Sequence, residues 1–134
     1  MEAMEGRKVL RVRGIRGATT CEANTRESIW EATGELLAEM VKRNQVDPEE
    51  VAAAIFTSTP DLDAAFPAAA ARAMGWTAVP LLGAQEMPVA GSPPRCLRIL
   101  LLVNTDRTQE EIQHVYLRGA VELRPDLALR SQGM

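Results

Sequence analysis

The feature of the sequence that most restricts its fold is an apolar run, Cys96–Val103, interrupted only by Arg98. A continuous apolar run of this length is typical of a buried strand, so we expect Arg95–Thr105 to be the central strand of a sheet. A guanidinium within such a strand is costly to bury unless an anion meets it. Arg98 therefore indicates either an ion pair, to Glu86 or Glu122, or a site for an anionic ligand.

The remaining patterns predict one α+β domain over residues 1–134 with a mixed five-stranded sheet. Period-two alternation and apolar runs predict strands over 8–16, 51–58, 77–87, 95–105 and 114–123, the first ending at Gly17 and the third interrupted near Gly83. Helical spacing and caps predict one long helix over 24–44, capped by Asn24 and Glu27, and shorter helices over 47–50, 66–74 and 108–111. Residues 1–7 are expected to be a loose leader and 124–134 a flexible tail.

These helices can cover only one face of the sheet. Aromatic residues make up 4% of the chain, so the core must consist of small aliphatic side chains, and such thin cores often depend on subunit contacts. We therefore expect the other face to pack against copies of the same chain.

Composition excludes several classes of function. A formal net charge of -3 argues against a nucleic-acid-binding protein. No apolar run reaches the ~20 residues that span a bilayer, and residues 1–8 lack the apolar core of a signal peptide. Cys21, Cys96 and the single histidine, His114, lack metal-ligand spacing, so no metal site is expected. A cytoplasmic protein with reduced thiols is the expectation.

The residues that could carry chemistry are charged groups on strands. Arg16 ends the first strand, Arg98 lies within the central one, and Arg124 follows the last. Glu86 follows an apolar segment, and Tyr116 is the only tyrosine. Taken singly, Arg16 could be an edge charge, Arg124 a solvated tail charge and Tyr116 a half-buried strand residue. Together they predict a site for a small polycarboxylate that carries a hydroxyl group.

Six blocks of sequence resemble the small α/β-type chorismate mutases, whose fold is unrelated to the all-helical type. They follow the family order at residues 13–20, 59–68, 85–87, 96–98, 114–117 and 123–127. The resemblance implies a homotrimer with pseudo-α/β-barrel packing, an active site in each cleft between subunits, and no metal or organic cofactor. It also implies the conversion of chorismate to prephenate, in the biosynthesis of phenylalanine and tyrosine by the shikimate pathway.

The resemblance further assigns roles to residues. As catalytic groups, Arg98 would reach the ether oxygen and a carboxylate, Arg16 would hold a carboxylate, and Glu86 would accept from the ring hydroxyl. Tyr116 would contact the side-chain carboxylate. The other substrate-binding positions that it implies are Phe66, Ala68 and Arg72 from the adjacent subunit, Leu81, Leu82, Gly83, Ala84 and Gln85 before the glutamate, and Leu123 and Arg124, which would close the site.

This chain departs from the family pattern at two positions, and its stretch from Phe66 to Trp76 is one residue shorter than in the family. Gly83 stands where a cysteine is frequent, so a side-chain contact is lost although a backbone N–H could still donate. Ala69 stands where a lysine is common, so one charge at the entrance is absent. These departures give some support to one alternative, a non-catalytic trimeric metabolite-binding protein. A second alternative is an imine deaminase-like trimer, since such proteins also place an arginine in the clefts between subunits.

Overall fold

The computed structural model describes residues 9–123, so the expected leader, 1–7, and tail, 124–134, lie outside the described residues. Five strands form one sheet: β1 (Arg11–Thr20), β2 (Val51–Ser58), β3 (Leu81–Gln85), β4 (Cys96–Thr105) and β5 (Val115–Tyr116). Two α-helices, α1 (Arg26–Asn44) and α2 (Ala68–Ala73), accompany three 3-10 helices, η2 (Pro48–Glu50), η3 (Gln109–Glu111) and η4 (Arg118–Leu123).

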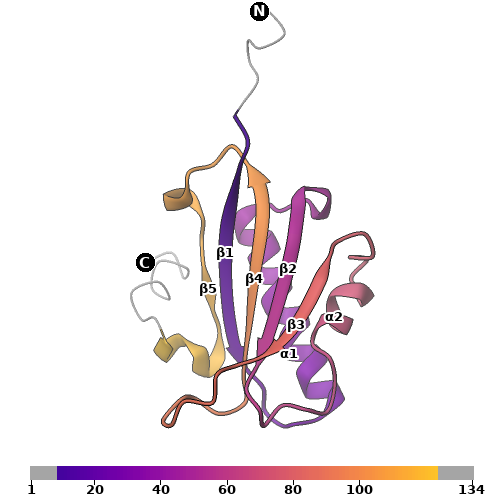
Figure 1. Cartoon of the computed structure of the whole chain (residues 1–134), viewed down its shortest axis with the longest axis vertical. Coiled ribbons are helices and arrows are strands. Elements are labelled where there is room, and N and C mark those ends of the chain that lie inside the picture. Colours follow the sequence, from indigo (N-terminus) through magenta and orange to yellow (C-terminus); the bar gives the residue numbers. More distant parts are fainter. Residues whose placement is uncertain (1–8, 124–134) are drawn as a thin grey trace, which may run out of the picture.

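The sheet has the strand order β3-β2-β4-β1-β5, with β4 at its centre (Figure 1). β4 is antiparallel to both neighbours, while β3 is parallel to β2 and β5 is parallel to β1. The expected mixed five-stranded α+β architecture and the central position of the 95–105 strand are therefore confirmed.

One face of the sheet is packed under α1. Leu97, Ile99 and Leu101 of β4 are fully buried on this side, together with Leu36 and Met40 of the helix. The apolar residues of α1 recur every three or four positions, so one face of the helix is apolar and packs on the sheet.

The opposite face of the sheet carries the alternate residues of each strand. Arg98, Leu100 and Leu102 of β4 are only half-buried there. Figure 1 views the sheet from this side, with α1 behind the strands and no helix of the described residues in front of them. We call this the open face. Among residues 9–123, no helix combines the length and apolar character needed to cross a membrane.

Two predictions at the start of the chain are wrong. β1 continues through Gly17 to Thr20, because Gly17 lies directly against Met40 and Leu36, where a side chain would clash. Gly17 therefore marks a position where the strand packs closely against α1, and not the end of the strand. The cap of α1 is Thr25, whose hydroxyl accepts from the Ser28 N–H at 3.1 Å, and not Asn24.

Asn24 instead joins two loops. Its side-chain oxygen accepts from the backbone N–H groups of Asp63 and Ala64, each at 3.0 Å. An asparagine before a helix can satisfy backbone donors of another segment as well as those of the helix, and the sequence does not distinguish the two.

The prediction of a strand over 114–123 is also largely wrong. Only Val115 and Tyr116 form a strand, and the chain then turns at Arg118, whose φ of 51° is left-handed, into η4. The strand expected over 77–87 is confined to Leu81–Gln85 and runs through Gly83 without interruption. The helix expected over 66–74 is limited to Ala68–Ala73, and Gly75 follows it with a φ of 94°.

Candidate functional site

A hollow of about 250 Å³ lies on the open face of the sheet. Strands β1, β2, β4 and β5 all contribute to its walls. We call it the arginine hollow, and its lining residues are Arg16, Gly17, Ala18, Ile55, Thr57, Arg98, Ile99, Leu100 and Tyr116. Three of the residues expected to form the site, Arg16, Arg98 and Tyr116, thus meet in one place within a single chain.

The register of the sheet explains why the two arginines meet. Arg16 pairs with Leu100 across the β1–β4 ladder, and Arg98 pairs with Ala18. Residues directly opposite one another share a face, so Arg16 and Arg98 project from the same side of the sheet.

Arg16 is exposed, and its guanidinium makes no hydrogen bond or ion pair with residues 9–123. Its backbone N–H donates to Nδ1 of His114 at 2.9 Å. The backbone is therefore fixed while the cationic group remains available to a ligand.

Arg98 lies beside Glu86. The Nε atom of Arg98 is 3.2 Å from Oε2 of Glu86, and the two side chains are 39% and 17% exposed. The N–H of that buried Nε is not aimed at the carboxylate, so it forms an ion pair without a hydrogen bond. Of the two partners considered from the sequence, Glu86 and not Glu122 is the one observed.

Glu86 is held by the neighbouring strand as well. Its backbone N–H donates to the Ser58 carbonyl at 2.8 Å, which extends the β2–β3 pairing by one residue. The hydroxyl of Thr57 donates to Oε2 of the Glu86 carboxylate. Thr57 is not among the residues expected from the sequence, because a hydroxyl residue near the end of an apolar strand is not by itself distinctive.

Tyr116 is buried, with 2% of its surface exposed, and not half-buried as considered from the sequence. Its ring packs with Ala18 and Ala120. Its hydroxyl makes no hydrogen bond within the described part of the chain. An unpaired buried polar group costs about 1–3 kcal/mol, so a phenol in this position beside a hollow favours a polar ligand group as its partner.

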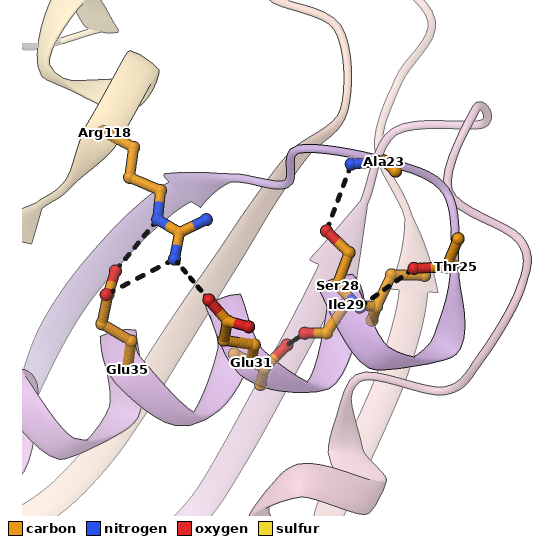
Figure 2. A network of polar contacts seen from close by, with 8 residues as sticks. Ala23, Thr25, Ser28, Ile29, Glu31, Glu35 and Arg118 are labelled. Atoms are coloured by element: carbon orange, nitrogen blue, oxygen red, sulfur yellow. Dashed lines mark hydrogen bonds and ion pairs between the residues drawn. The ribbon is translucent and has the colours of Figure 1, made fainter.

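The segment that follows Tyr116 is attached to α1 by Arg118 (Figure 2). The Arg118 guanidinium contacts Glu35 at 3.1 Å and Glu31 at 3.5 Å. The next N–H, that of Gly119, donates to the Thr20 hydroxyl at 3.1 Å. These contacts place η4, which ends at Leu123, against β1 and β5, beside Tyr116.

A second hollow, of about 570 Å³, lies at the ends of β2 and β3. We call it the phenylalanine hollow, and its lining residues are Phe56, Ser58, Thr59, Pro60, Leu62, Asp63, Ala64, Ala65, Phe66, Pro67, Gly83, Ala84 and Gln85. Four of the predicted residues, Phe66, Gly83, Ala84 and Gln85, line this hollow and not the first. Phe66 is 79% exposed, an unusual position for a phenylalanine.

The other expected site residues are distributed as follows. Leu82 and Arg72 are exposed, Leu81 and Leu123 are half-buried, and the side chain of Ala68 belongs to the core. None of these five lines the arginine hollow. Arg124 lies outside the described residues.

The two cysteines are buried and free, and burial raises the pKa of both thiols, those of Cys21 and Cys96. Raised values make these thiols poor nucleophiles. Within residues 9–123, no three His, Cys, Asp or Glu side chains gather in a way that could hold a metal ion.

Comparison with known proteins identifies the family. The model of the family "chorismate mutase type I" matches residues 12–127. The chorismate mutase AroH of Thermus thermophilus is 58% identical over 117 residues, covering 87% of this chain and 96% of the relative. The chorismate mutase AroH of Bacillus subtilis is 47% identical over 119 residues, covering 88% and 94%.

A solved structure agrees with these sequence matches. The chorismate mutase from Clostridium thermocellum superposes with a TM-score of 0.79 at 48% identity, covering 80% of this chain and 96% of that one. The sequence identity thus extends over nearly the whole of each relative, and the solved structure has the same fold as this chain. Arg16 and Arg98 of the open face both lie within the residues that the family model matches. The chain belongs to the type I chorismate mutase family.

Proposed function

We propose that this chorismate mutase, an isomerase, rearranges chorismate to prephenate at the arginine hollow, using Arg16, Arg98, Glu86 and Tyr116. The observation that carries this assignment is the convergence on one hollow of two guanidinium groups and a phenol that has no hydrogen-bond partner among residues 9–123. A small dicarboxylate with an ether oxygen and a ring hydroxyl complements that set of groups.

The first task of the site is to fix the shape of a flexible substrate. In an intramolecular Claisen rearrangement, one C–O bond breaks while one C–C bond forms, and the enolpyruvyl arm must first fold over the ring. Orientation of reacting groups can supply up to ~7–11 kcal/mol. Arg16 would bind one carboxylate, and the buried hydroxyl of Tyr116 would donate to the other.

The second task is to stabilise charge that grows as the C–O bond stretches. Negative charge develops on the ether oxygen and positive character on the ring. A guanidinium placed in advance at the oxygen binds the transition state more strongly than the ground state. Arg98 would supply it, and Glu86 would accept from the ring hydroxyl while favouring the cationic ring. Because no proton is transferred, the reaction requires no general base.

The two hollows of one chain support an active site shared between subunits. Phe66, Gly83 and Gln85 are separated from Arg16, yet the resemblance places all four around one substrate. A homotrimer in which the phenylalanine hollow of one subunit faces the arginine hollow of the next would bring them together. Phe66, Ala68 and Arg72 would then come from the neighbour, with Leu81 and Leu82 contributing apolar walls.

The remaining parts of the proposal concern the ends of the chain and its setting. Leu123 and Arg124 would close the site over bound substrate, adding uniform binding energy that acts on KM. The enzyme would work without a cofactor and without nucleic acid, as a step of phenylalanine and tyrosine biosynthesis. Free Cys21 and Cys96 are compatible with a reducing cytoplasm.

A spectrophotometric assay of chorismate loss, combined with the mass of the protein in solution, tests this proposal. We expect saturable turnover by a species of three chains. Chorismate binding without turnover would instead establish the metabolite-binding alternative, and imine hydrolysis in the absence of chorismate turnover would establish the deaminase-like one. A fully active monomer would overturn the shared site.

A further inference from the structure

The Glu86 carboxylate makes its contacts with the described residues through a single oxygen. The Thr57 hydroxyl donates to Oε2, and the Arg98 Nε atom lies 3.2 Å from that same oxygen. The other oxygen, Oε1, accepts no hydrogen bond within residues 9–123. One side of the carboxylate is therefore occupied, and the other is available.

The register of the sheet places Thr57 between the two residues it connects. Thr57 pairs with Arg98 on the antiparallel side and with Ala84 on the parallel side, two positions before Glu86. Residues two apart on a strand share a face, so Thr57, Arg98 and Glu86 all belong to the open face. The β-branched side chain of threonine restricts its χ1 rotamer, which limits where the hydroxyl can point.

The contact between Arg98 and Glu86 differs from the pairing that these groups favour. An arginine and a carboxylate commonly form a bidentate pair, with two parallel N–H···O bonds. Such a pair would occupy both oxygens of Glu86 and one edge of the guanidinium. Here the Thr57 hydroxyl occupies Oε2, and within residues 9–123 no hydrogen bond joins the terminal nitrogens of Arg98 to the Glu86 carboxylate.

We propose that Thr57 is a positioning residue that prevents Glu86 and Arg98 from closing into a bidentate pair. It holds Oε2, leaves Oε1 to accept from the ring hydroxyl of the substrate, and leaves the terminal nitrogens of Arg98 for the ether oxygen and a carboxylate. This inference rests on the proposed function, because it concerns how two catalytic groups are kept apart. A threonine with only a structural role would affect stability and not turnover.

Three variants separate the hydroxyl from the shape of the side chain. We expect Thr57→Val, which keeps the shape, to lower kcat by about tenfold, since a hydrogen bond to a charged group contributes about that factor. KM should rise by a smaller factor than kcat falls, because the groups that Thr57 keeps apart bind the transition state more strongly than the bound substrate. Thr57→Ser retains a hydroxyl and should restore kcat to within about threefold of the parent. If the valine variant does not fold, Thr57→Ala replaces it.

Thr19→Val is the matched control. Thr19 lies on β1 and is fully buried, but its hydroxyl makes no hydrogen bond within residues 9–123, and it does not line the arginine hollow. This variant makes the same chemical change at a strand threonine on the opposite face of the sheet, where Thr19 pairs with Leu97, so kcat and KM should remain unchanged.

A double-mutant cycle with Glu86→Gln provides the decisive test, with chorismate loss as the readout. We expect Thr57→Val to lower kcat by less than about twofold in the Glu86→Gln background, because a glutamine has one acceptor oxygen and cannot form the bidentate pair that Thr57 prevents. An equal tenfold loss in both backgrounds, full activity of Thr57→Val, or failure of serine to restore kcat would overturn the inference. Full activity of Glu86→Gln itself would overturn the proposed catalytic role of Glu86. That result would contradict the proposed function and is distinct from a failure of the Thr57 inference alone.

Discussion

Arg16 of β1 and Arg98 of β4 lie diagonally across one antiparallel ladder, each two residues from the position that faces the other. Diagonal neighbours of this kind are about 7–8 Å apart at Cα, within reach of long side chains. One small dianion could therefore contact both guanidinium groups, as the proposed reaction requires.

Replacement of Arg98 by lysine tests whether the fork of donors matters beyond its charge. Arg98→Lys keeps the positive charge, but a single ammonium group cannot contact Glu86, an ether oxygen and a carboxylate in the same geometry. We expect kcat to fall by about 100-fold or more, in line with the roughly 2.7–4 kcal/mol lost when an oxyanion-hole donor is removed. Steady-state chorismate loss measures it.

The control for this variant is Arg26→Lys. Arg26 is an exposed arginine on α1 that stacks over the Trp30 ring at 5.4 Å, outside the arginine hollow. The Arg26→Lys variant should leave kcat unchanged. Near-normal turnover of Arg98→Lys would remove Arg98 from the catalytic group.

Arg118 should affect substrate binding from outside the hollow. Its guanidinium joins η4 to Glu31 and Glu35 of α1 (Figure 2). Ala120 of η4 packs with Tyr116. Arg118→Ala removes that attachment and loosens the segment from Tyr116 to Leu123, so we expect KM for chorismate to rise several-fold while kcat changes little. Exposed ion pairs contribute about 0.2–1 kcal/mol each, so the loss in unfolding free energy should be small.

Two further variants distinguish this attachment from a general effect on α1. Glu35→Gln should raise KM in the same direction, because it removes the closer of the two carboxylates. Glu39→Gln removes a carboxylate that pairs with Arg43 of the same helix at 2.9 Å and should leave KM unchanged. Equal effects of the two glutamine variants would contradict the prediction.

A side chain at Gly17 should force Met40 and Leu36 to shift. A Cβ atom at this position would overlap Met40 Sδ and lie 3.1 Å from Leu36 Cδ1, and both of those residues are fully buried. We expect Gly17→Ala to lower the free energy of unfolding by about 1–3 kcal/mol, the usual cost of overpacking. Urea unfolding measures it. Gly34→Ala on α1, where a Cβ meets nothing within 4 Å, should instead raise stability by about 0.5–1 kcal/mol.

Asp61 should contribute to stability in a pH-dependent way. The Thr59 hydroxyl donates to this carboxylate and lowers its pKa below the ordinary value of 3.8, helped by the Arg95 N–H at 2.8 Å. A folded pKa below the unfolded one means that the contribution is complete above about pH 4–5 and disappears as the pH falls through the folded pKa.

Asp61→Asn should therefore be less stable than the parent at pH 7, and the difference should shrink towards pH 3. Urea midpoints measured at pH 7, 5, 4 and 3 provide the comparison. The carboxylate is largely exposed, so the effect is expected to be modest. A difference between the two proteins that stays constant over this range would exclude the ionised carboxylate as its source.

The sequence predicted the elements that depend on local pattern. Residues 51–58 form β2 with the expected bounds, because their apolar character and the flanking prolines at 48 and 60 define both ends. Prediction from the sequence failed where a tertiary contact overrides the local pattern. Gly17 does not end its strand because α1 packs against it, and the alternation after Val115 does not form a long strand because Arg118 turns the chain.

Part of the site was also predictable, because some of its residues lie on strands that the local pattern predicts. Arg16, Arg98 and Tyr116 lie on strands, and once those strands pair, their faces determine which side chains meet. Thr57 was not predictable, because a threonine in a strand has no distinctive sequence signal until its hydroxyl is seen to donate to Glu86. Nor could the separation of Phe66 from Arg16 within one chain be read from spacing along the sequence.

The ten paired positions of β1 and β4 also determine which insertions the enzyme can accept. An extra residue in the segment between β3 and β4 would be absorbed by a longer turn. An extra residue within β4 before Arg98 would exchange the two sides of the strand, so that Leu97 would take the outward place and the guanidinium would be forced under α1. Natural length variation should therefore accumulate in the former segment and be rejected in the latter.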